Sequence, residues 1–185
     1  GADVSRNIIF HLAKTADVWV RDYGPIFVKR GDSRLMTKWI FNAWGGKYSD
    51  LAEDTAVFDK IGPGLGFQMR KTGIVLEGGS IDVNGKGTLL TTEQCLLAKT
   101  RNPHLSRSQI ESKLMEYLGA RNVIWLKEGV VGGDTDGHVD DIARFVDERT
   151  VLCAYEDDPA DANHRALSEN FKLLEKSKDQ DGEAL

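Results

Sequence analysis

An irregular repeat constrains the fold of this chain more than any other feature of its sequence. Asp22 precedes a strand-like hairpin, Glu77 in "LEGGSID" precedes a second one 55 residues later, and His138 in "DTDGHVDD" precedes a third after another 61 residues. The segments "GSID" at 79–82 and "GHVD" at 137–140 also match in pattern. A period of this length resembles that of the longer propeller repeats. We therefore expect similar units around an axis, with the residues that precede each hairpin meeting at a common cavity.

The apolar runs and turns predict the strands of these units. Runs of strand length are residues 8–12, 26–28, 35–41, 74–76, 88–91, 123–126, 143–146 and 151–154. "NGKG", which begins at Asn84, is a strong hairpin signal because Asn and Gly both tolerate positive φ. "RGDS" at 30–33 and "DERT" at 147–150 predict looser turns between strands.

Helices are predicted between the hairpins. The clearest one follows Ser106, a capping residue with Gln109 three positions later, and it should stop at Gly119. A second is expected from Asp158, because proline follows this capping residue at the first helical position. A third covers residues 53–61. Helices alternating with hairpins predict an α/β fold.

Composition narrows the classes of protein to which the chain can belong. Its 185 residues, 41% of them hydrophobic, suit one domain over 1–185. The net charge of −5 comes without a basic stripe, so we expect no nucleic-acid partner. No apolar run approaches the about 20 residues that cross a bilayer, and no signal-peptide pattern opens the chain, so we expect no membrane partner and a cytoplasmic location. Cys95 and Cys153 lie far apart in apolar surroundings, which predicts neither a disulfide framework nor a thiolate metal site.

The residues before the hairpins are the candidates for a functional site, although each has a simpler explanation. Asp22 could be a turn residue paired with Arg21 at the surface. Glu77 could merely end a strand, but the two glycines after it allow a ligand to approach the backbone closely. His138 could be a satisfied core histidine. Asp140 lies two residues after His138. In an extended segment the two side chains would therefore lie on the same face and point into one pocket.

Three further residues are weaker candidates. Asp134 and Asp136 lie in a Gly-rich loop, where acidic turn residues are expected in any case. Trp19 could be a core tryptophan.

Together these side chains predict an acidic pocket with one group that titrates near neutrality. Such a pocket favours a cation, and two carboxylates suit a planar guanidinium especially well because each accepts paired N–H donors. A divalent-metal site built from Asp22, Glu77, His138 and Asp140 is the rival interpretation. With a single histidine in the set, catalytic zinc is disfavoured.

Four segments carry a resemblance to a known family. "WVRDYGP", "LEGGSID", "NPHLSRSQIESKL" and "DTDGHVDDIARFV" resemble the agmatine deiminase branch of the peptidylarginine-deiminase-like enzymes, in the guanidine-modifying superfamily with the pentein fold. The resemblance implies a five-bladed α/β propeller around a central site, and no cofactor or metal. It implies a reaction in which a cysteine attacks the guanidinium carbon, ammonia leaves, and water releases a ureido product. Agmatine would yield N-carbamoylputrescine, a step in polyamine biosynthesis towards putrescine.

The resemblance also implies a role for each candidate. Asp22 and Asp140 would bind the guanidinium nitrogens. His138 would act as general acid for the departing ammonia and then as base for water, and Glu77 would orient His138. Trp19 and Asp134 would line the substrate channel.

One departure from the family concerns the nucleophile. The family's reactive cysteine lies in a Gly-rich segment near the C-terminus, whereas Cys95 and Cys153 resemble buried, inert thiols. We therefore expect a fragment, an incomplete propeller that lacks an N-terminal stretch and the last one or two blades. Free or peptidyl arginine as substrate, and a binding module without activity, remain open alternatives. Unpaired edge strands leave a homo-oligomer open as well.

Overall fold

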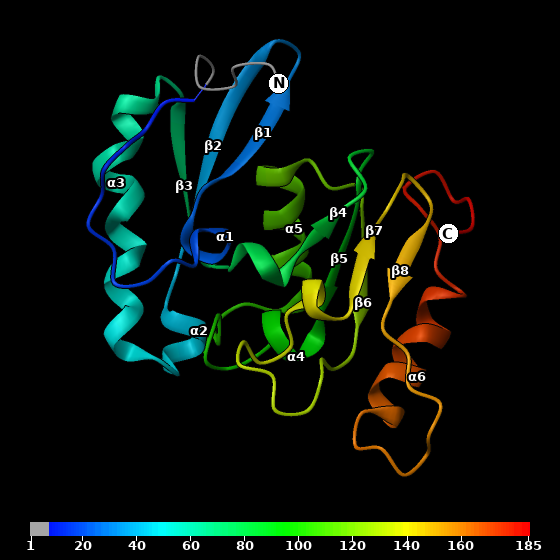
Figure 1. Cartoon of the computed structure of the whole chain (residues 1–185). Coiled ribbons are helices and arrows are strands. Elements are labelled where there is room, and N and C mark those ends of the chain that lie inside the picture. Colours follow the sequence, from blue (N-terminus) through cyan, green and yellow to red (C-terminus); the bar gives the residue numbers. More distant parts are fainter. Residues whose placement is uncertain (1–7) are drawn as a thin grey trace, which may run out of the picture.

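The computed structural model describes residues 8–185, and it shows a mixed α/β fold built from three units in chain order (Figure 1). The first unit contains β1 (Ile26–Arg30), β2 (Ser33–Ile40) and β3 (Gln68–Val75). The second contains β4 (Asp82–Val83), β5 (Thr88–Thr92) and β6 (Asn122–Leu126). The third contains β7 (Ala143–Phe145), β8 (Val151–Cys153) and the helix α6 (His164–Leu174). Figure 1 shows the three units side by side in this order, with α6 at the outer edge of the third.

The first two units have the same connectivity, which confirms the predicted repeat. In each, an antiparallel hairpin is followed by helices, and the third strand then pairs in parallel with the second strand of the hairpin. The helical segment of the first unit comprises α2 (Ala43–Gly46), η2 (Ser49–Ala56), α3 (Val57–Ile61) and η3 (Gly62–Leu65). That of the second comprises α4 (Glu93–Leu96) and α5 (Arg107–Leu118). The third unit repeats the hairpin and then the helix.

A short helical turn precedes each hairpin, and the three turns bring distant parts of the chain together. They are α1 (Val20–Tyr23), η4 (Gly78–Ser80) and η5 (Val139–Asp141). α1 contacts η4, and η4 contacts η5. Asp22, Glu77, His138 and Asp140 belong to these turns or lie directly before them, so the turns converge as expected, although Glu77 does not line a cavity with the other three.

Local sequence explains the best-defined elements. The Ser106 hydroxyl accepts a hydrogen bond from the Gln109 amide while the Gln109 side chain accepts one from the Ser106 amide, so the predicted capping box begins α5. α5 ends at Gly119, which is left-handed with φ 72°. In the β4–β5 hairpin, the Asn84 side chain accepts hydrogen bonds from the amides of residues 86, 87 and 88, and Gly85 takes the positive φ.

Three apolar clusters hold the units together. The largest, which includes Trp39, Leu76 and Leu89, packs the strands of the first two units against α5. A second surrounds Leu126 and Val139 and covers β7 with α6. A third, around Tyr23 and Trp44, lies beneath α1 and α2. Over residues 8–185, no helix combines the length and the apolar character that a membrane crossing needs.

Three predictions of secondary structure were wrong wholly or in part. Residues 8–12 form no strand, because this apolar run has no strand partner in the described part of the chain and its side chains are exposed. Residues 53–61 are divided between the 3₁₀ segment η2 and α3. α6 starts at His164 rather than after Asp158, because Asp158 and Asp161 accept hydrogen bonds from backbone amides two residues on and form turns that compete with a helix.

Asp82 joins the second and third units, although its place in "GSID" matches that of Asp140 in "GHVD". The carboxylate of Asp82 is buried and accepts hydrogen bonds from the Arg144 side chain at 3.1 Å and from the Phe145 amide at 2.6 Å. The same sequence pattern therefore has two different structural roles. Asp82 joins two units, whereas Asp140 lines a cavity.

We predict that Asp82→Ala lowers the free energy of unfolding by about 1–3 kcal/mol, because it leaves a buried amide and an arginine without their acceptor. Urea denaturation followed by circular dichroism measures this change. The matched control is Asp181→Ala, which breaks an exposed pair with Arg121 and should change stability by no more than about 1 kcal/mol. Equal effects of the two substitutions would contradict the docking role of Asp82.

Candidate functional site

A cavity of about 440 Å³ lies at the convergence of the turns. Most of the candidate residues line it together with aromatic side chains from the first unit. Its polar and aromatic lining residues are Asp17, Trp19, Arg21, Asp22, Trp44, Tyr48, Asp134, Thr135, His138, Asp140 and Asp141. Five aspartates against one arginine make this lining strongly acidic.

Asp22 is held in place from two other segments. Its Oδ1 accepts a hydrogen bond from the Gly79 amide at 3.0 Å, and its Oδ2 accepts one from the Trp44 indole at 3.2 Å. Burial raises the pKa of Asp22, although both hydrogen bonds oppose the shift. The carboxylate is therefore fixed in orientation at the wall of the cavity.

His138 lies close to both candidate carboxylates. Its Nδ1 is 3.8 Å from Asp22 Oδ1 and 3.9 Å from Asp140 Oδ1, which is too far for direct hydrogen bonds. A Cβ at position 79 would come within 2.5 Å of this nitrogen, so Gly79 is required for the approach. The second ring nitrogen, Nε2, is buried and has no hydrogen-bond partner among residues 8–185.

The structure reverses the expectation that His138 titrates near neutrality. Burial, followed by the positive charges of Arg101 and Arg21, lowers the pKa of His138 to about 3. Burial and the neighbouring Asp141 raise the pKa of Asp140 to about 6. His138 is thus neutral at pH 7, and Asp140 changes charge just below neutrality.

Glu77 lies behind the cavity rather than in its lining. Its Oε1 accepts a hydrogen bond from Arg101 Nε at 3.1 Å in an ion pair whose side chains are 0% and 1% exposed. Its Oε2 lies 4.0 Å from the Cys95 sulfur. Burial raises the pKa of Glu77, against the opposing charge of Arg101. Ligand atoms of Glu77 and His138 lie within 4.8 Å of one another without a hydrogen bond, so a role in orienting His138 stays a prediction.

Aromatic side chains form a wall of the cavity. The Trp19 and Trp44 rings meet edge to face, as do those of Trp44 and Tyr48. The Tyr48 hydroxyl donates to Asp134 at 3.2 Å. Trp44 has φ 54°, which costs a bulky residue on the order of 1–3 kcal/mol and marks a position that the surrounding structure enforces.

Neither cysteine of the chain is placed as a nucleophile. Cys95 is fully buried, and burial together with Glu77 raises the pKa of its thiol. Cys153 lies on β8 within the apolar cluster that covers α6, and it does not line the cavity. The expectation that both thiols are inert is consistent with these positions.

The residues proposed for a metal site do not form one set of ligands. Glu77, Cys95 and His138 present ligand atoms within 4.8 Å of one another, but the Arg101 guanidinium already neutralises Glu77 there. Asp22 and Asp140 lie 3.8 and 3.9 Å from Nδ1 of His138 and do not belong to that set. This arrangement favours a cation with its own hydrogen-bond donors at the two aspartates.

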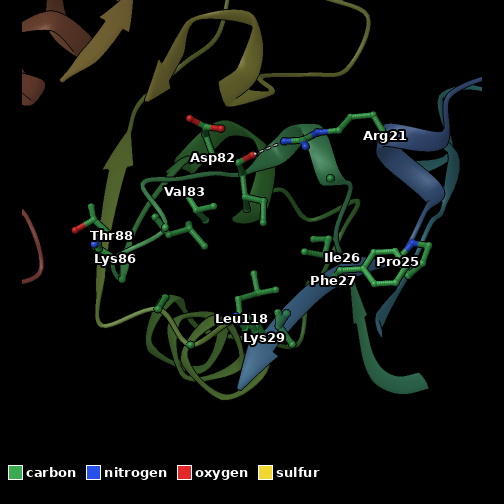
Figure 2. Close-up of a pocket in the computed structure, with 18 of the residues that line it drawn as sticks. Arg21, Pro25, Ile26, Phe27, Lys29, Asp82, Val83, Lys86, Thr88 and Leu118 are labelled. Atoms are coloured by element: carbon green, nitrogen blue, oxygen red, sulfur yellow. Dashed lines mark hydrogen bonds between the residues drawn. The ribbon is translucent and has the colours of Figure 1, made fainter. Parts of the chain in front are cut away.

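A larger cavity, of about 650 Å³, lies away from this chemistry (Figure 2). It separates β1 from the β4–β5 hairpin and the end of α5, and Phe27, Val83 and Leu118 line it. Figure 2 shows Arg21 reaching across its rim, where the guanidinium donates to the Ile81 carbonyl at 3.1 Å. Asp82 is the one carboxylate in its lining and is already bound to Arg144, so the smaller cavity is the candidate site.

Sequence reasoning placed Trp19, Asp22, Asp134, His138 and Asp140 at one cavity, and the structure brings them together. Asp136 lies beside it and pairs with Lys47 at 3.0 Å. Trp44 and Arg101 were missed. The two glycines that follow Trp44 were a sequence signal for an unusual turn at this position. The sequence around Arg101 contains no signal that its side chain is buried.

Comparison with known proteins shows the family. The chain is 46% identical over 178 residues to the agmatine deiminase of Stutzerimonas stutzeri, covering 91% of this chain and 48% of that protein. Its structure matches the agmatine deiminase of Enterococcus faecalis with a TM-score of 0.87 and 40% identity, over 93% of this chain and 49% of that one. A substrate-bound C315S variant of the C. jejuni agmatine deiminase matches with a TM-score of 0.81 and 36% identity, over 97% and 53% of the two chains.

The chain therefore spans about half the length of the relatives that it matches. The family model for Porphyromonas-type peptidyl-arginine deiminases matches residues 2–185, and the chain belongs to that family.

Proposed function

We propose that the cavity binds the guanidinium group of agmatine and that these residues serve the hydrolysis of that group. The observation that supports this most strongly is the position of Asp22 and Asp140, whose carboxylates lie 3.8 and 3.9 Å from one imidazole nitrogen in an acidic, aromatic-walled cavity. Two carboxylates can accept the paired N–H donors of a flat cation and keep it charged, so that its carbon stays electrophilic. The names of the relatives support agmatine as the substrate.

The charge of the lining favours agmatine over arginine. Agmatine carries an ammonium group at the end of its chain and no carboxylate, whereas arginine carries a carboxylate that Asp17, Asp134 and Asp141 would repel. Free or peptidyl arginine remains the second substrate class to be tested.

The proposed reaction needs a thiolate that neither Cys95 nor Cys153 supplies. A cysteine from outside residues 1–185 attacks the guanidinium carbon, and the carbon–nitrogen bond to the departing ammonia breaks, leaving a thiouronium intermediate. Water then adds to that carbon and the thiolate leaves, so that agmatine and water become N-carbamoylputrescine and ammonia. Because His138 is neutral, it first accepts the proton of the thiol and passes it to the departing ammonia; it then takes a proton from water and returns it to the departing thiolate.

We also propose that the three units are blades of an incomplete pentein-type α/β propeller. The repeated hairpin, helix and parallel-strand connectivity supports this arrangement, as does the contact between the turns that precede the hairpins. The cavity would then lie near the axis of the propeller.

We predict that Asp22→Asn and Asp140→Asn each weaken agmatine binding about tenfold to a hundredfold, because each removes one charged acceptor of the guanidinium. Isothermal titration calorimetry of the 185-residue chain measures the dissociation constants of agmatine and arginine, with and without a chelator. The matched control is Asp32→Asn in the exposed β1–β2 turn, which should bind as the unchanged protein does. Tighter binding of arginine would contradict agmatine as the ligand, and loss of binding with chelator would support the metal alternative.

Agmatine binding should also depend on pH below neutrality. Asp140 has its pKa raised to about 6, so at pH 5 this carboxyl is mostly protonated and a guanidinium that binds to it must displace the proton. Affinity is therefore full above pH 7 and falls as the pH decreases, and at pH 5 it should be about tenfold weaker. Titrations between pH 5 and 8 test this, and Asp140→Asn should flatten the profile. A profile that stays flat in the unchanged protein would assign the binding to another group.

A guanidinium-binding role without turnover is the second candidate for these residues by themselves, because both cysteines lie outside the cavity. We predict that the 185-residue chain releases no ammonia from agmatine in a coupled assay at neutral pH. Release that disappears in Cys95→Ser or in Cys153→Ser would show that the thiol in question had been misjudged.

A further inference from the structure

Arg101 is a buried cation that the proposed reaction leaves without a role. It follows α4, its side chain is 1% exposed, and it does not line the cavity. It nevertheless donates to Glu77 Oε1 at 3.1 Å and to the Thr135 carbonyl at 2.8 Å. A buried charge is costly unless it is paired and hydrogen-bonded, so these partners account for its place in the interior.

Three segments that adjoin the cavity meet this one guanidinium. Glu77 directly precedes η4, whose Gly79 amide holds Asp22. Thr135 lines the cavity and lies three residues before His138. Asp136 Oδ2 lies 3.9 Å from the guanidinium.

The third segment is the turn that carries Trp44. A Cβ on Gly45 would lie 2.8 Å from Arg101 Nη1, so the glycine with φ 78° lets the turn pack directly on the guanidinium. Its neighbour Trp44 donates to Asp22. Arg101 thus contacts the two segments that hydrogen-bond Asp22 and the one that leads to His138.

We propose that Arg101 is a positioning residue for the guanidine site: its guanidinium fixes Glu77, the 135–138 loop and the Gly45 turn relative to one another and so sets the geometry of Asp22 and His138. The proposal rests on the guanidinium-binding function proposed above. It requires arginine specifically, because two nitrogens of one planar group donate at once, Nε to Glu77 and Nη2 to Thr135, which a lysine ammonium on a flexible stem does not reproduce.

The charge of Arg101 also reaches the groups around His138. Asp22 and Asp140 face the Nδ1 side of the ring at 3.8 and 3.9 Å, while Glu77 and Cys95 have ligand atoms within 4.8 Å of it. Arg101 and Arg21 favour the neutral imidazole, and Asp136 opposes them. A lysine at position 101 keeps the positive charge but loses the planar group that donates two hydrogen bonds at once. This substitution therefore distinguishes the positioning role of Arg101 from the effect of its charge.

Arg101→Lys in the 185-residue chain tests the proposal, with Arg107→Lys as the matched control, since Arg107 is a partly exposed arginine that pairs with Glu93 at the start of α5. We expect Arg101→Lys to weaken agmatine binding at least tenfold and to lower the ¹⁵N NMR order parameters of residues 135–138. Arg107→Lys should change neither. Asp82→Ala, which destabilises the fold away from Arg101, should leave the agmatine affinity unchanged.

An NMR titration of the unchanged protein with agmatine adds a second test, which distinguishes a positioning role from a role in stability alone. The Arg101 Nε–H resonance should move with the same agmatine dependence as the Gly79 amide, although Arg101 lies outside the cavity, and Arg121 Nε–H should stay still. The proposal would be overturned if Arg101→Lys bound agmatine within twofold of the unchanged protein and its order parameters for residues 135–138 were the same within error. If agmatine moves no resonance at all but Arg101→Lys loosens the 135–138 loop, the guanidine function fails while the positioning role stands.

Discussion

The hydrogen bond between the Gly79 amide and the Asp22 carboxylate is the interaction on which the candidate site depends. It joins the turn before the first hairpin to the turn before the second, and these turns lie 57 residues apart in sequence. The same carboxylate accepts from Trp44, which brings in the aromatic wall. A backbone amide is a donor that substitution of the side chain cannot remove, and glycine at this position also leaves room for His138. One peptide group therefore sets both the orientation of a carboxylate and the approach of the imidazole.

Sequence reasoning succeeded where the signal was local or periodic. The capping box at Ser106, the stop at Gly119 and the Asn84 hairpin are short-range, so neighbouring residues alone determine them. The spacing of Asp22, Glu77 and His138 predicted their convergence because equivalent positions of repeated units meet in space. The prediction of a strand at residues 8–12 failed, since an apolar run becomes a strand only if another strand pairs with it.

The contribution of Arg101 was invisible in the sequence for a different reason. A single arginine among surface charges has no local pattern that distinguishes a buried ion pair from a solvated side chain. Its partners, Glu77 and the Thr135 carbonyl, lie 24 and 34 residues away, and one of them is a backbone oxygen that no residue type encodes. Trp44 is an intermediate case, because the glycines after it indicated an unusual turn but not the contact with Asp22.

The protonation of the cavity follows from which charges are buried beside which. A histidine between two carboxylates is usually expected to be cationic, since nearby negative charge stabilises the imidazolium. Here desolvation and two arginines outweigh that attraction and keep His138 neutral. The pKa that lies near neutrality is instead that of Asp140. Asp140 is therefore largely ionised at pH 7 and largely protonated at pH 5, whereas His138 stays neutral over this range. The change in charge of the cavity near neutrality thus comes from a carboxylate and not from the imidazole, because burial raises the pKa of an acid and lowers that of a base.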